Sequence, residues 1–169
     1  SILAAAQPIP CGTPFPGTIL FPTGAVTFQF TARAGEAVSI AVAKTGGEAA
    51  FTPCWKLIAP RPAGTVIGQS SAKAEALLRA DGGYSIQVGD CGGVSTGDFN
   101  LTLQAISPTL NGAPSCAAPF TCGNTVSAPI VGPGVTKAYK FAGMAGQSLL
   151  IGTAPTGGSV DYCSWELVA

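Results

Sequence analysis

The sequence contains no histidine, and this absence removes several kinds of chemistry at once. Ser-His-Asp and Cys-His nucleophiles, an imidazole general base and the commonest zinc ligand are all excluded. Charge is also scarce, since charged residues make up 9% of the chain, against about 25% in an ordinary soluble domain. Eight basic residues balance eight acidic ones. We therefore expect neither catalysis nor binding to nucleic acid or anionic lipid.

Long hydrophobic runs are missing as well. No stretch approaches the roughly 18 uninterrupted apolar residues that a membrane-spanning helix needs, so we expect no membrane span. The opening segment 1–6 is too short for a signal-peptide core. Because the chain starts with serine, we read it as processed or as an excerpt. Glycine and proline are abundant instead, with 23 and 14 residues, and this frequency favours an all-β fold of short strands joined by turns.

Apolar and polar residues alternate with a period of two in many segments, which is typical of half-buried strands. The clearest of these predicted strands are 26–31, 38–43, 84–88 and 99–104. Two shorter strands are predicted at 54–59 and 64–69, on either side of a proline pair that cannot donate hydrogen bonds to a sheet. Segment 73–80 has helical propensity, but its alternation and the turn that follows favour a strand.

The chain also resembles itself at an offset of 111 residues, without a gap over about 40 positions. Near the end the offset becomes 110. The matched pairs include Cys11 and Cys122, Phe30 and Phe141, Gly35 and Gly146, Ile40 and Ile151, and Trp55 and Trp165. Copies that share turn glycines and apolar positions indicate one supersecondary unit built twice.

The second copy covers only the first half of the first one, so we predict a jelly-roll-like β-sandwich with one full copy plus the first half of a second. The predicted division is a lead-in strand or linker from a preceding unit at 1–10, a complete repeat at 11–107, a linker at 108–121, and a half repeat at 122–169. Another segment or another chain would complete the half repeat.

Large apolar side chains of the half repeat would line one sheet with no opposite layer. At roughly 2 kcal/mol per side chain, this exposure would cost on the order of 10 kcal/mol. We therefore predict an assembly surface whose partner is the same kind of chain, either head-to-tail copies or neighbouring repeats. Its expected residues are Ile2, Leu3, Tyr139, Phe141, Leu149, Ile151, Trp165 and Leu167.

Six cysteines without histidine favour disulfides over metal sites, and disulfides indicate an extracellular or cell-surface location. We predict that Cys54 pairs with Cys91, because both fall near strand ends within the complete copy. We also predict that Cys116 pairs with Cys122 across a short loop at the junction. The partners of Cys11 and Cys163 stay open, since six cysteines allow 15 connectivities.

Two further candidate sites are a calcium site and a glycosylation site. Asp90 and Asp98 bracket a glycine-rich loop, and their carboxylates with loop carbonyls could hold Ca²⁺, although turn formation explains both residues more simply. No other cofactor is expected. Asn100 begins an Asn-Leu-Thr glycosylation sequon and lies on the predicted outward face of its strand.

Three segments carry a resemblance to a known family. The patterns at 34–40, 83–88 and 96–104 resemble the bacterial pre-peptidase C-terminal domain, over 11–106 once and over 122–169 in part. The resemblance implies a secreted β-sandwich of the jelly-roll kind, often found in tandem. It also implies an accessory or structural module that follows secreted peptidases or is repeated in surface proteins, and that in some members binds calcium.

Two functions from different classes fit these observations. The first is a non-catalytic extracellular structural protein, in which tandem β-sandwiches build a filament, stalk or surface layer and are completed across unit boundaries. It accounts for the low charge, the cysteines, the missing histidine and the half repeat together. The alternative is an accessory substrate-binding module of a secreted peptidase or other hydrolase, which predicts a catalytic domain in the same polypeptide.

Overall fold

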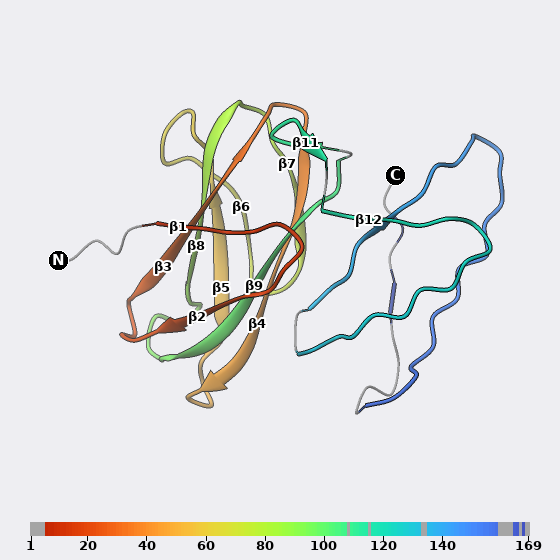
Figure 1. Cartoon of the computed structure of the whole chain (residues 1–169). Helices are drawn as coiled ribbons and strands as arrows, with labels where there is room; N and C mark the ends of the chain where they lie inside the picture. Colours follow the sequence, from red (N-terminus) through yellow and green to blue (C-terminus); the bar gives the residue numbers. More distant parts are fainter. Residues whose placement is uncertain are drawn as a thin grey trace.

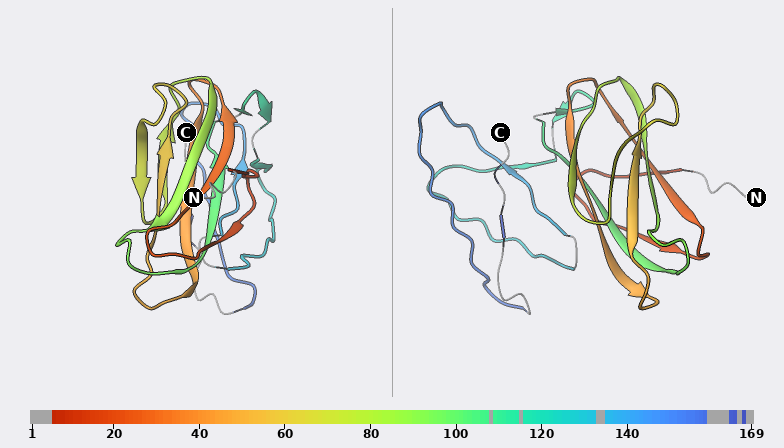
Figure 2. Two further views of the ribbon diagram at one scale, coloured as in Figure 1. Left: turned by 90° about the vertical axis from the view of Figure 1, so that its left-hand side faces the viewer. Right: turned by 180° about the vertical axis from the view of Figure 1, so that it is seen from behind.

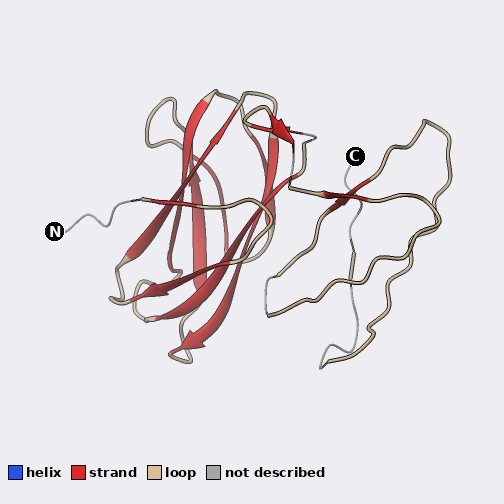
Figure 3. Ribbon diagram, in the orientation of Figure 1, coloured by secondary structure: helices blue, strands red, loops and turns tan. Residues whose placement is uncertain are grey.

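The computed structural model describes residues 6–107, 109–114, 116–132, 135–158, 164, 165 and 167. Within this part of the chain the regular structure is entirely β (Figure 3). No described segment forms a helix that could cross a membrane. Two sheets pack face to face and form a β-sandwich, as predicted (Figure 1).

The two sheets are built from strands that are far apart in sequence. The five-stranded sheet contains, in order, β1 (Gln7–Pro8), β3 (Ala25–Ala32), β8 (Gly82–Asp90), β5 (Pro53–Ile58) and β6 (Val66–Ser70). The four-stranded sheet contains β2 (Phe15–Ile19), β9 (Gly97–Ala105), β4 (Ala37–Gly47) and β7 (Ala74–Leu77). Neighbouring strands are antiparallel except β1 and β3, which are parallel.

The core forms where the alternating apolar side chains of both sheets meet. Phe28 of β3 is fully buried, and its ring lies edge-on to Phe15 at 5.5 Å and to Phe99 at 6.2 Å across the sandwich. Such edge-to-face pairs add about 0.5–1.5 kcal/mol each beyond burial alone. The polar ends of buried aromatics are also satisfied, since Tyr84 donates its hydroxyl to Ala80 O at 2.8 Å. The sequence alternation therefore fixes which face of each sheet is inside.

The seven strands predicted inside the complete repeat are all present. The segment with helical propensity forms β7, as predicted from its alternation. Strand β2 was not predicted, because Pro16 and Gly17 interrupt its pattern. Both residues suit this place: β2 is an edge strand, where a missing N–H is tolerated, and a Cβ on Gly17 would lie 2.3 Å from the Phe99 ring.

The segments on either side of the predicted repeat also belong to the sandwich. In the predicted lead-in, β1 pairs with β3 and Ile9 is buried. In the predicted linker, β10 (Thr109–Leu110) and β11 (Ala113–Pro114) form a hairpin, and Leu110 packs against the core. The described part of the sandwich thus runs from β1 to this hairpin.

The described residues after this hairpin lie beside the sandwich, largely as extended loops (Figure 2). We call residues 118–169 the second tract. Its described residues contain only β12 (Ala118–Pro119) and β13 (Tyr139–Lys140), which pair in parallel. The side-chain Nε2 of Gln104 in β9 donates a hydrogen bond to Thr136 O of the second tract at 3.4 Å, and Val135 is buried. The predicted sheet over 122–169 is not formed in the part that the structure describes.

Candidate functional site

The second tract exposes five of the eight apolar side chains that were predicted as an assembly surface. Tyr139, Phe141, Leu149, Trp165 and Leu167 are all exposed, and Trp165 has 54% of its surface accessible. Ile151 is half-buried. The two remaining predicted members, Ile2 and Leu3, lie outside the described residues, so nothing tests their part in this surface.

The same positions in the first copy are buried. Trp55, the counterpart of Trp165, is 1% exposed, and its indole N–H donates to Ala72 O at 2.9 Å. The other counterparts are buried in the same core: Phe28, Phe30, Val38, Ile40 and Leu57. The sequence expectation that all six would line one sheet is wrong. Their counterparts lie on β3 and β5 of one sheet and on β4 of the other, so they face each other across a core.

The pairing of β12 with β13 repeats the pairing of β1 with β3. Ala118 lies opposite Tyr139. At the matching positions of the first copy, Gln7 lies opposite Phe28, also in parallel. The two strand pairs are therefore related by the same offset of 111 residues that the sequence shows. Residues 118–121, which were predicted to belong to a linker, include the strand β12 of the second pair.

Backbone hydrogen bonds of the turns recur at the same offset. Three bonds of the first copy have a counterpart in which donor and acceptor are both shifted by the repeat offset, with N···O distances between 2.8 and 3.3 Å. These pairs are Ile9 N–H to Gln29 O with Phe120 N–H to Lys140 O, Gly24 N–H to Phe21 O with Val135 N–H to Gly132 O, and Glu36 N–H to Arg33 O with Gln147 N–H to Met144 O.

Glycine backbone angles recur in the same way. Three glycine pairs related by the repeat offset all lie in the left-handed region that L residues rarely adopt. Their φ values are 82° at Gly12 and 84° at Gly123, 89° at Gly35 and 84° at Gly146, and 96° at Gly47 and 87° at Gly158. The local turns of the second tract thus follow those of the first copy even where strand pairing is missing.

The topology of the sandwich explains why the second tract lacks the other strand pairings of the first copy. None of β2, β3, β4 and β5 pairs with another member of that set; each pairs with β8 or β9. The second tract repeats residues up to 59, so it contains no counterparts of β6 to β9. The one pairing inside the first half is β1 with β3. Its counterpart, β12 with β13, is also the one strand pairing in the described part of the second tract.

One of the two disulfide predictions is confirmed and the other is wrong. Cys54 is bonded to Cys91, as predicted. Cys116 is bonded to Cys11 rather than to Cys122, across 105 residues of sequence. The reason is that Gly12 N–H donates to Leu103 O at 2.8 Å, which brings the start of the sandwich beside the end of β9. Two disulfides agree with an extracellular or periplasmic location.

The remaining cysteines are Cys122 and Cys163. Cys122 is exposed and has no disulfide partner among the described residues. It is the repeat counterpart of Cys11. Cys163 lies outside the described residues, and its partner stays open.

A buried carboxylate holds the β10–β11 hairpin against the sandwich by hydrogen bonds. Glu36 is 6% exposed and accepts hydrogen bonds from Arg33 N–H at 2.8 Å and Asn111 N–H at 2.7 Å. It also accepts from Thr109 Oγ1 and Gly112 N–H. Burial raises the pKa of this carboxyl, but the four donors together outweigh burial and hold the pKa below its ordinary value. This role of Glu36 was not predicted from the sequence.

Asp90 and Asp98 were the candidate calcium ligands. The Asp90 carboxylate accepts N–H donors from Thr52, Val94 and Ser95 at 2.9–3.0 Å. These bonds, that from Thr52 first, hold the pKa of Asp90 below its ordinary value. Asp98 accepts the Thr18 hydroxyl at 2.7 Å. No group of three or more His, Cys, Asp or Glu side chains in the described part of the chain is placed to hold a metal ion. Calcium binding stays untested.

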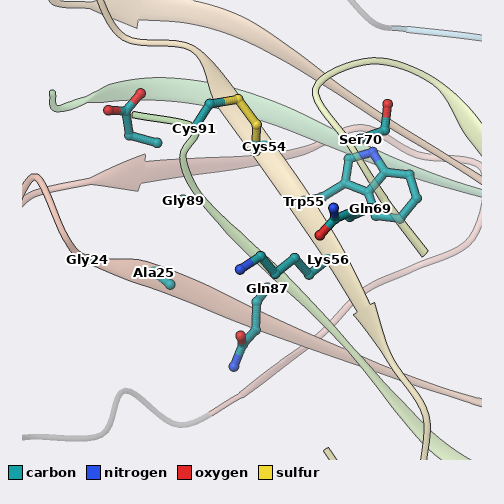
Figure 4. A pocket seen from close by; sticks show the side chains of 11 residues that line it. Gly24, Ala25, Cys54, Trp55, Lys56, Gln69, Ser70, Gln87, Gly89 and Cys91 are labelled. Atoms are coloured by element: carbon teal, nitrogen blue, oxygen red, sulfur yellow. A yellow bond between two sulfur atoms is a disulfide. The ribbon is translucent and has the colours of Figure 1, made fainter. Parts of the chain in front are cut away.

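The five-stranded sheet has a shallow groove of about 460 Å³ on its surface (Figure 4). Lys56, Gln69 and Gln87 come from three different strands and contribute polar groups to its lining, next to Gly24 and Gly89. The Trp55 indole also borders the groove, but almost all of it is buried. The groove therefore offers amide and ammonium groups without an exposed aromatic platform among its lining residues.

Asn100, the candidate glycosylation site, lies on β9 and is half-buried. A Cβ placed on Gly132 would lie 3.9 Å from the side-chain nitrogen of Asn100, so the second tract passes close to this amide. Glycosylation of Asn100 stays a prediction.

Comparison with family models and with curated proteins finds no match. Among solved structures the chain is similar to PliG, a periplasmic inhibitor of g-type lysozyme. The Aeromonas hydrophila protein has 16% identity, a TM-score of 0.45, and coverage of 59% of this chain and 96% of that chain. For the Salmonella Typhimurium protein the values are 14%, 0.44, 60% and 99%.

A third similar structure is the pre-peptidase C-terminal domain of collagenase from Bacillus anthracis. It has 15% identity and a TM-score of 0.47, and the match covers 59% of this chain and 94% of that domain. This neighbour belongs to the family that the strand and turn patterns of the sequence resemble.

Proposed function

We propose that the chain belongs to a non-catalytic extracellular structural protein, in which β-sandwich repeats follow one another and build a filament, stalk or surface layer. The observation that carries the proposal is the second tract. It follows the turns and the β1–β3 pairing of the first copy while leaving the apolar side chains of its half core exposed. Such a tract is the start of another sandwich.

Energetics support the same conclusion. Taking a large apolar side chain from full exposure to burial stabilises a fold by roughly 2 kcal/mol. The five side chains are between 36% and 54% exposed, so a complete second sandwich would recover about 5 kcal/mol from them. A folded domain is stable by only about 5–15 kcal/mol in total. The free energy recovered by completing the second sandwich is therefore comparable with the total stability of a small domain, and it favours assembly.

Composition and cross-linking fit a durable extracellular role. The chain has few charges and no histidine, which supports a module without catalytic residues of the common kinds. The Cys11–Cys116 disulfide joins the segment near the start of the sandwich to the segment that follows its last hairpin. Successive units would then be joined by short connections between covalently closed domains.

Electron microscopy of the native material under oxidising conditions tests this proposal. The expected result is a fibre, stalk or layer with a repeat of about 30–40 Å, because strands of nine to eleven residues at about 3.4 Å per residue set the length of one sandwich. Single globular particles with no repeat would contradict the proposal.

The accessory-module alternative has one observation in its favour, the polar groove of Figure 4. It predicts that the chain co-sediments with an insoluble polymer such as collagen or cellulose, and that Lys56→Ala with Gln87→Ala abolishes this binding. It also predicts a native polypeptide that carries a hydrolase domain, which an intact-mass measurement would reveal.

A further inference from the structure

We propose that the second tract is a docking surface for a strand unit of the same type as β6–β9, and that Cys122 links covalently to that unit. The inference rests on the proposed function and specifies the partner, its register and its cross-link. The partner is a second copy of the strand set that closes the first sandwich.

The first sandwich shows where each partner strand would enter. Strand β8 lies between β3 and β5, and β9 lies between β2 and β4. In the second tract the counterparts of β3 and β5 are 136–143 and 163–168, and those of β2 and β4 are 126–130 and 148–158. The partner therefore contributes one strand to the middle of each sheet, which is why the tract cannot form the sheets alone.

The register also follows from the first sandwich. Phe28 of β3 lies opposite Ile86 of β8. Its counterpart Tyr139 should lie opposite the partner's equivalent of Ile86. A shift by one residue would turn the apolar side chains of the partner strand to the outside, so the register is strongly specified.

The chemistry of the partner is set by the side chains that cover the first core. Its β8-like strand must present inward residues of the type of Tyr84, Ile86 and Val88, which are fully buried in the first sandwich. Its β9-like strand must alternate as β9 does, and a cysteine must follow at the distance that separates Leu103 from Cys116. A short peptide with a single strand would leave the other sheet open.

Cys122 is placed in the second tract as Cys11 is placed in the first copy. Both cysteines precede a glycine with a positive φ, 82° at Gly12 and 84° at Gly123. In the first copy, the bridge between Cys11 and Leu103 positions the sulfur for Cys116. The β9-like strand of the partner would bring its own following cysteine to Cys122 by the same contact.

The cross-link forms by thiol–disulfide exchange with a small disulfide oxidant such as oxidised glutathione. The Cys122 thiolate attacks one sulfur of the oxidant, forms a mixed disulfide and releases one thiol. The partner's cysteine, also as a thiolate, then displaces the second thiol. Two protein thiols lose two protons and two electrons, and the oxidant is reduced to two thiols.

The test uses the full chain extended at its end by its own residues 60–121. Ala169 matches Ala59 at the same offset that relates Trp165 to Trp55, so this extension supplies the missing strand set in register. We expect the fraction of tryptophan emission quenched by acrylamide to fall from about half to near zero, because Trp55 is already buried and Trp165 becomes so. With oxidised glutathione present, peptide mapping should find Cys122 bonded to the added copy of Cys116.

Two matched controls separate the strands from the cross-link. The extended chain with Cys122→Ser should bury Trp165 but form no such bond. The extended chain in which the added copies of Ile86 and Leu101 are aspartate should do neither, while the first sandwich stays folded.

The outcomes distinguish this inference from the function on which it rests. If Trp165 becomes buried but Cys122 remains a reactive thiol, the cross-link is overturned and the tandem structural role stands. If Trp165 stays accessible in the extended chain, the docking surface itself is overturned. The electron microscopy of native material then decides the proposed function independently.

Discussion

The Cys11–Cys116 disulfide predicts an unusual response to mechanical tension. Its two Cα atoms are 5.6 Å apart, although 105 residues of sequence separate them. A force applied to both ends of the chain therefore passes through the disulfide and does not load the strands between. A filament or stalk built from such units would carry tension without unfolding its sandwiches.

The magnitude follows from the chain lengths that each disulfide encloses. Without either disulfide, unfolding the sandwich should release about 370 Å, since an extended residue spans at most about 3.6 Å and the Cα–Cα distance must be subtracted. With Cys11→Ser and Cys116→Ser, the 37-residue separation across Cys54–Cys91 stays closed, and the release should be about 240 Å at the same rise per residue.

Single-molecule force spectroscopy with handles at both termini measures these lengths. The oxidised unmodified chain should show no unfolding step of either size below the force that breaks a covalent bond. Addition of a reductant should produce the step of about 370 Å. A step of about 240 Å in the oxidised unmodified chain would refute the reasoning, because it would mean that Cys11 and Cys116 are not bonded.

Two further predictions concern stability in solution. Glu36→Gln removes a buried charged acceptor with four donors, so we expect a loss of about 1–3 kcal/mol in urea unfolding at neutral pH. Because the folded pKa of Glu36 lies below 4.5, its contribution to stability is present above that pH and is lost as the pH falls through the folded pKa. The unfolding free energy of the variant should therefore lack this decline at acid pH. Trp55→Ala should cost about 3–5 kcal/mol, whereas Trp165→Ala in the 169-residue chain should change the unfolding free energy by less than about 0.5 kcal/mol. Equal effects of the two tryptophan variants would show that Trp165 is already packed in a core.

Much of the sandwich could be predicted because its signals are local. Segments such as β3 and β8 can be predicted as strands from their alternation alone, since one face of each is buried by the opposite sheet. Even β7 followed its alternation rather than its helical propensity, because Leu78 and its neighbours complete the core. Strand β2 was missed because Pro16 interrupts the alternation on which the prediction of strands depends.

The cross-links and the buried carboxylate could not be predicted because they depend on long-range pairing. Cys11 meets Cys116 only because the segment after β1 runs beside the end of β9. Glu36 meets Asn111 only because the exit hairpin folds back over the turn before β4. The repeat offset was visible in the sequence, but that β12 pairs with β13 required the structure.

Hydrogen–deuterium exchange of 136–143 tests most directly whether the second tract is a half sandwich awaiting partner strands. In the 169-residue chain these amides should exchange rapidly, while those of β3, their counterparts, are protected. In the native assembly, both segments should be equally protected. Slow exchange of 136–143 in the isolated chain, or rapid exchange in the assembly, would contradict the account.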